Sequence, residues 1–199
     1  VPELIDLERW AELFRENPAE PEPGEFAVLS VGRFYPRKRF AVLLEAAAEL
    51  RTELPQLRVR IVGDGPERGR LLSMCRRLRL EPTVRWLGNL SQAELAREYN
   101  RCSVFALPSV QEGFGIVFLE AMAAGKPVVA ARAGAVPEVV EHGLLVEPGS
   151  AQALADGLRK MCRDALLRRR LAEAGAGAVF RYNTPEVSRQ FLTAVRHLV

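Results

Sequence analysis

Two glutamates bracket the start of an apolar segment in QEGFGIVFLEAMAAG, residues 111–125. Glu112 precedes Gly113 and Gly115, whose missing side chains let backbone N–H groups at a helix start approach an anion. Glu120 lies within the apolar segment, where a carboxylate without partners is costly to bury. Sugar hydroxyls are suitable donors to such a carboxylate. The ordinary alternative is that both glutamates are exposed residues of a helix, and the two interpretations stay open on these residues alone.

A second group of residues suited to chemistry lies in GRFYPRK, residues 32–38, directly after the apolar run 26–31. Gly32 lets the backbone turn away from a strand. Arg33 offers a planar fork of donors for phosphate oxygens, and Lys38 offers a compact positive charge. This segment predicts a phosphate site, with a solvated basic loop as the alternative.

A third segment, GDGP at residues 63–66, contains Gly63 after another apolar run. It either holds a ligand against the backbone or forms a tight turn before a helix. The G-x-G-x-x-G fingerprint of nicotinamide enzymes does not follow the first apolar run, and the Walker loop is missing as well. The two commonest phosphate loops are therefore excluded.

The elements that must position these residues alternate along the chain. Apolar runs predict six buried strands, at 26–31, 57–62, 84–87, 102–107, 127–131 and 144–147. Helical patterns are found at 39–54, 66–80, 91–100, 115–124, 136–141, 150–163, 164–182 and 185–198. This alternation predicts an α/β fold with a doubly wound, parallel, six-stranded Rossmann-like sheet. Ligands bind such sheets at the carboxyl ends of the strands, where the glycine-containing and basic loops lie.

Residues 1–23 are interpreted as an N-terminal arm and linker, because a short helical pattern is followed by the Pro-rich acidic stretch PAEPEPGE. Residues 24–199 are interpreted as one nucleotide-binding domain. The chain begins with Val1, so we expect it to be a piece of a longer protein.

Composition narrows the function classes. The net charge of +3 is too small to indicate nucleic acid as a partner. Three scattered cysteines and two distant histidines provide no metal-ligand spacing, and they suit a reducing, cytoplasmic location. No apolar run reaches the length of a membrane span. The basic segment 158–170 could contact an acidic membrane surface peripherally, but a solvated helix face is the favoured interpretation.

Taken in order, SVGRFYPRK, IVGDGP, VRWLGNL and ALPSVQEGFGIVFLEAMAAGKPVVA resemble the C-terminal domain of the family-4 (group 1) retaining glycosyltransferases. The resemblance covers about residues 26–150. That family has the GT-B architecture, in which two Rossmann-like domains face each other across a cleft. The resemblance implies that this chain is one half of a GT-B fold and that the N-terminal acceptor domain lies outside it. It also implies that residues 1–23 are the interdomain connector.

The resemblance also implies roles. Arg33 and Lys38 would neutralise the diphosphate of a UDP-, GDP- or ADP-linked sugar, Glu112 would lie beside the transferred sugar, and Glu120 would accept the ribose hydroxyls. The implied catalytic residues are Arg33, Lys38 and Glu112. The implied donor-binding residues are Gly32, Arg33, Lys38, Gly63, Arg85, Gly113, Phe114, Gly115 and Glu120, with Arg85 opening a segment to Asn89 that meets the base.

The implied activity is hexosyl transfer with retention of anomeric configuration, without a metal or a cofactor other than the donor substrate. An isolated donor domain is expected to bind the donor but to be poorly active. The unknown acceptor would be held by the N-terminal domain of the full-length protein. The alternatives are a Rossmann-like nucleotide-binding or assembly module without catalysis and, as a minor option, an epimerase of GT-B type.

Overall fold

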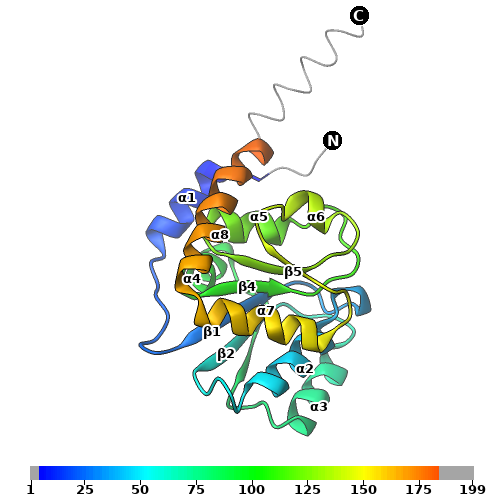
Figure 1. The fold of residues 1–199 in the computed structure, drawn as a ribbon. Coiled ribbons are helices and arrows are strands. Elements are labelled where there is room, and N and C mark those ends of the chain that lie inside the picture. Colours follow the sequence, from blue (N-terminus) through cyan, green and yellow to red (C-terminus); the bar gives the residue numbers. More distant parts are fainter. Residues whose placement is uncertain (1–4, 184–199) are drawn as a thin grey trace, which may run out of the picture.

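A computed structural model describes residues 5–183 of the chain (Figure 1). Its centre is one six-stranded sheet with the order β3-β2-β1-β4-β5-β6, and all neighbouring strands run parallel. The strands are β1 (Phe26–Val31), β2 (Leu57–Val62), β3 (Val84–Gly88), β4 (Val104–Leu107), β5 (Val128–Ala131) and β6 (Leu144–Val146). The predicted six-stranded, parallel, Rossmann-like sheet is confirmed.

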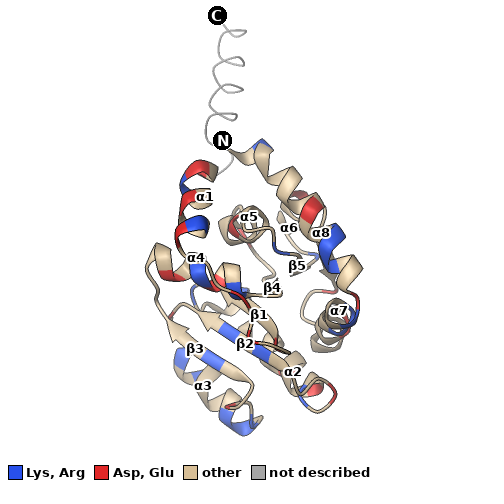
Figure 2. Cartoon of the chain, turned by 90° about the vertical axis from the view of Figure 1, so that its left-hand side faces the viewer, with Lys and Arg blue, Asp and Glu red and all other residues tan. Residues whose placement is uncertain are grey.

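Helices cover both faces of this sheet (Figures 1 and 2). They are α1 (Leu7–Glu16), α2 (Phe40–Leu50), α3 (Arg68–Arg77), α4 (Gln92–Arg101), α5 (Ile116–Ala123), α6 (Val136–Val139), α7 (Ala151–Arg163) and α8 (Ala165–Ala178), with short 3-10 helices η1 (Pro36–Lys38) and η2 (Val179–Tyr182). α2 packs against α3 and α7, whereas α1 packs against α4 and α5. The helix predicted over 185–198 lies outside the described residues.

The two central strands are buried on both faces, because every residue of β1 and β4 is buried. This burial explains their continuous apolar sequences. β1 pairs with β2 on one side and β4 on the other, with Val28 opposite both Val59 and Val104. The connections leave β1 and β4 in opposite directions, so the loops that follow these two strands meet at the carboxyl edge.

One strand carries a buried charge that the sequence analysis did not identify. Arg60 of β2 is 7% exposed, and its guanidinium pairs with the carboxylate of Glu98 on α4, which is 8% exposed. The Nη2–Oε1 distance is 2.7 Å, and a second bond joins Nε to Oε2. This two-bond geometry satisfies both charges inside the domain and fastens α4 to the sheet.

Helix α1 is part of the packed domain rather than a separate arm. Trp10 is buried, and its ring meets the Tyr99 ring edge-on at 5.9 Å. Asn100 Nδ2 also donates to the carbonyl of Phe14 at 2.7 Å. At the chain's other end, Asn183 forms a parallel bridge with Ile5. The role of residues 1–23 as an interdomain connector stays a prediction.

Candidate functional site

Two loops from opposite sides of the switch point are joined at the carboxyl edge of the sheet. The backbone N–H of Val110, after β4, donates to the carbonyl of Arg37, after β1, at 2.9 Å. The hydroxyl of buried Ser109 donates to the same carbonyl at 3.1 Å. The loop after β5 lies against them, because a Cβ built on Gly134 would be 3.9 Å from the Val110 oxygen. Segments predicted to carry chemistry therefore converge here.

The side chains of Lys38 and Glu112 meet at this junction. Lys38 Nζ donates to both carboxylate oxygens of Glu112 at 2.7 Å. Their side chains are only 13% and 7% exposed, so the charges are shielded from bulk water. The stem of Lys38 lies beside Gly32, where a Cβ would be 3.7 Å from Lys38 Cε. One cation and one carboxylate, predicted independently from two loops, thus share one site.

The start of α5 lies next to this pair. Gly115 is the N-cap with φ +79°, a left-handed conformation that favours glycine. The backbone N–H groups of residues 113–115 donate to no residue within 5–183. Because these donors lie ahead of a helix start, where the helix dipole also favours negative charge, they are a candidate anion-binding position directly after Glu112.

Glu120 lies within α5, about 6 Å along the axis from Ile116 at a rise of about 1.5 Å per residue. Its carboxylate is partly buried and accepts a hydrogen bond from the Tyr99 hydroxyl, at 2.8 Å from Oε2. Burial raises the pKa of Glu120 above its ordinary value, and the Tyr99 hydrogen bond acts in the opposite direction. The sequence did not identify Tyr99, because its only link to Glu120 is the packing of α4 against α5.

Arg33 lines a pocket of about 380 Å³ at the same edge of the sheet. Its other lining residues are Asp64, Gly65, Pro66 and Asn89, from the loops after β2 and β3. The Arg33 guanidinium lies 5.5 Å from the centre of the Tyr35 ring. The loops after β2 and β3 therefore line the same pocket as Arg33, although the sequence analysis named neither Asp64 nor Pro66 as a site residue.

Arg85 does not join these residues. It is the second residue of β3, near the amino end of the strand, and lines a separate pocket of about 330 Å³ with Arg58, Glu81 and Glu25. Figure 2 shows basic residues in blue on β2, the strand whose Arg58 also lines this pocket. Residues 85–89 were expected to contact the nucleotide base. Of these residues, Asn89 lies in the Arg33 pocket at the carboxyl edge of the sheet, and Arg85 does not.

Phe114 and Gly63, which the resemblance implies as donor-binding residues, both make packing contacts within the domain. The Phe114 ring packs against Tyr182 of η2 with 5.3 Å between ring centres. Gly63 has φ +123°, and a Cβ there would lie 2.1 Å from the oxygen of Gly32. Close approach of two loops explains this glycine without any ligand.

The same substitution at two glycines should consequently have very different effects on stability. We expect Gly63→Ala to lower the free energy of unfolding by about 3 kcal/mol, since a left-handed backbone and a clash with Gly32 combine. Gly113→Ala meets no atom within 4 Å and should stay within about 1 kcal/mol of wild type. Urea unfolding of both variants measures this difference, and equal stability losses would contradict the described loop packing.

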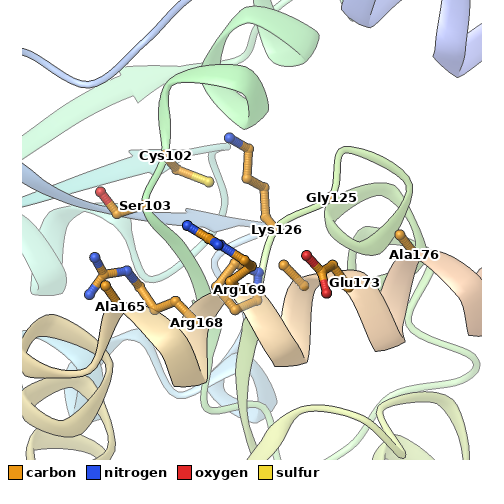
Figure 3. A pocket seen from close by; sticks show the side chains of 11 residues that line it. Cys102, Ser103, Gly125, Lys126, Ala165, Arg168, Arg169, Glu173 and Ala176 are labelled. Atoms are coloured by element: carbon orange, nitrogen blue, oxygen red, sulfur yellow. The ribbon is translucent and has the colours of Figure 1, made fainter.

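A larger pocket of about 570 Å³ lies at the opposite edge, beside the residues that precede β4 and β5 (Figure 3). Lys126, Arg168 and Arg169 line it, but Lys126 Nζ donates to the Asn100 carbonyl at 2.8 Å. Arg168 Nη1 donates to the Cys162 carbonyl at 3.0 Å. These two cations are engaged within the domain, so the basic surroundings do not by themselves indicate a ligand.

The basic segment 158–170 is similarly engaged. It spans the end of α7 and the start of α8, and Glu53 pairs with both Arg159 and Arg163.

Within residues 5–183, no helix is long and apolar enough to cross a bilayer. The same residues contain no group of three or more His, Cys, Asp or Glu side chains placed to hold a metal ion. Peripheral membrane contact stays a prediction.

Comparison with known proteins agrees with this fold. The sequence model of the glycosyl transferases group 1 family matches residues 12–177. The phosphatidyl-myo-inositol mannosyltransferase of Mycobacterium leprae is 39% identical over 170 residues, which are 83% of this chain and 45% of that protein. The chain spans less than half the length of the first curated relatives that it matches.

Two solved structures share the fold. HepE of Anabaena, solved in complex with UDP and glucose, superimposes with a TM-score of 0.83 at 26% identity, over 97% of this chain and 55% of that chain. The C-terminal domain of the group 1 protein LpcC from Francisella tularensis superimposes with a TM-score of 0.73 at 27% identity, over 92% of this chain and 95% of that chain.

The parallel sheet and the loops gathered at its carboxyl edge define the class of this protein, which is one Rossmann-like half of a GT-B fold. The family match then places it within that class. The chain belongs to the glycosyl transferases group 1 family and is a glycosyltransferase domain of the C-terminal type.

Proposed function

We propose that this domain binds a nucleotide-diphosphate sugar and supplies the donor half of a retaining, metal-independent sugar transfer. The observation that carries the proposal is the Lys38–Glu112 pair, with 2.7 Å between Lys38 Nζ and each carboxylate oxygen, directly ahead of the free N–H groups of residues 113–115. A cation and oriented N–H donors suit a diphosphate. A carboxylate beside them suits the hydroxyls of the attached sugar.

In this proposal, binding of the donor diphosphate breaks the ion pair between Lys38 and Glu112, and Lys38 pairs with the diphosphate instead. Lys38 and the start of α5 then stabilise the charge that develops on the leaving diphosphate as the bond to the sugar breaks. Released from Lys38, Glu112 accepts hydrogen bonds from the transferred sugar. Arg33 contacts the diphosphate from the neighbouring pocket, and Glu120 accepts the ribose hydroxyls.

HepE, solved with UDP and glucose, supports a nucleotide-sugar donor for this chain. Retention and metal independence rest on the resemblance of the motifs to the family-4 enzymes. The acceptor is assigned to a second domain, since the chain spans less than half of its first curated relatives. The isolated domain should therefore bind donor with little or no transfer activity.

A calorimetric panel of UDP, GDP, ADP and their sugar conjugates tests the proposal with a matched pair of variants. Arg33→Ala should weaken binding of the preferred nucleotide about tenfold, because one charge-assisted contact to phosphate is lost. Arg37→Ala removes the same charge from the same loop, where its guanidinium also lies over the Tyr35 ring, and should bind like wild type. Equal losses in the two variants, or no binding of any nucleotide by wild type, would count against the proposal.

A further inference from the structure

The hydroxyl of Tyr99 lies inside an aromatic cluster with no water access. Tyr99 is 0% exposed, and its ring contacts Trp10, Phe14 and Phe105 at centre distances of 5.9, 6.4 and 5.9 Å. These rings come from two other elements, α1 and β4, which together fix the position of the tyrosine on α4. Phenylalanine would fill nearly the same volume, so the presence of a hydroxyl group at this buried position requires an explanation.

The hydroxyl oxygen lies 2.8 Å from Oε2 of Glu120 and 3.3 Å from the Val117 carbonyl. A carboxylate on its own turns about its side-chain torsions, and a donor held by three rings restricts that freedom. Within residues 5–183, Oε1 of Glu120 accepts no hydrogen bond. One oxygen is thus fixed from inside the domain while the other keeps its lone pairs for a ligand.

We infer that Tyr99 is a positioning residue that orients the Glu120 carboxylate for recognition of a ribose diol. This inference rests on the proposed function, because it gives Glu120 the ribose hydroxyls as donors. It goes further in assigning nucleotide selectivity to a buried residue that touches no ligand. The domain should distinguish ribonucleotides from 2′-deoxyribonucleotides, and that discrimination should depend on the Tyr99 hydroxyl.

The test compares the affinities of the preferred nucleoside diphosphate and its 2′-deoxy analogue by calorimetry. Wild type should bind the ribonucleotide about tenfold more tightly, since a hydrogen bond to a charged group is lost in the analogue. Tyr99→Phe should reduce this ratio to about threefold by weakening the ribonucleotide alone. Glu120→Gln should bring it close to one.

Two further variants separate positioning from general loss of stability. Ile61→Val removes one methyl group from the sheet face opposite that of Arg60 and α4, costs about 1 kcal/mol, and should keep the tenfold ratio. The double variant Tyr99→Phe/Glu120→Gln leaves no carboxylate without its donor, so it should fold. Its ratio should equal that of Glu120→Gln alone, because the two residues act as one unit.

An unchanged ratio in Tyr99→Phe together with a lost ratio in Glu120→Gln would overturn the role of Tyr99 and leave the proposed function intact. An unchanged ratio in both variants would overturn the assignment of Glu120 to the ribose. A reduced ratio in Ile61→Val would show that destabilisation alone changes the discrimination, which would also overturn the inference.

Discussion

Lys38→Met should lower the affinity of the domain for its nucleoside diphosphate by about 100-fold. The substitution removes a cation from the phosphate position and leaves the Glu112 carboxylate, only 7% exposed, facing the incoming negative charge. Loss of attraction and gain of repulsion act together, which is why we expect a larger effect than for Arg33→Ala. Calorimetry gives the affinity, and urea unfolding reports the accompanying stability loss.

Glu112→Gln is the informative partner of this variant, because the change in affinity should have the opposite sign. Lys38 is then no longer engaged by a carboxylate, so the nucleoside diphosphate without its sugar should bind at least as tightly as to wild type. The double variant Lys38→Met/Glu112→Gln should recover stability but not affinity, since no buried charge is left unpaired. Normal affinity in Lys38→Met would remove the central support for the proposed site.

Glu98→Ala should lower the free energy of unfolding by about 3–5 kcal/mol. It leaves the Arg60 guanidinium buried under α4 without its partner, and an uncompensated buried charge is among the most costly defects in a core. Chemical denaturation with guanidinium chloride measures the loss. Some of the variant population is expected to be unfolded even without denaturant, because natural domains are only marginally stable.

The control for this experiment is the same substitution at another ion-paired glutamate. Glu53 pairs with Arg159 and Arg163 near the surface. When Glu53 is removed, water can solvate the two guanidinium groups that lose their partner. Glu53→Ala should therefore cost no more than about 1 kcal/mol. If Glu53→Ala and Glu98→Ala were equally destabilising, burial would not be the source of the Glu98 effect.

The strands and the convergence of the site loops could be predicted because both follow from local patterns. Continuous apolar runs identify strands buried on two faces, and parallel strands bring their following loops to one edge. Lys38 and Glu112 are 74 residues apart, yet this rule alone places them together, and the structure joins them by an ion pair. The resemblance implied the roles of Lys38 and Glu112, whereas the topology of the sheet was enough to predict that they lie close together.

What could not be predicted depends on side-chain packing between distant elements. Tyr99 reaches Glu120 only because α4 lies beside α5, and Arg60 finds Glu98 across the sheet face. A tyrosine or an arginine in the sequence does not indicate which partner it will meet. Arg85 was grouped with Asn89 because the two residues are close in the sequence. Arg85 lies near the amino end of β3, however, and the loop after β3 lies at the carboxyl end, so the two residues are at opposite edges of the sheet.

The bridge between Ile5 and Asn183 has a mechanical consequence. Tyr182, next to Asn183, accepts a hydrogen bond from the N–H of Ile5 at 3.1 Å, and its ring rests against Phe114 in the loop that precedes α5. The two ends of the described chain are thereby tethered to each other and to the glycine-rich loop (Figure 1). Because the Tyr182 ring packs on Phe114, the position of the two ends is coupled by direct contact to the loop that contains the N–H groups of the proposed phosphate position.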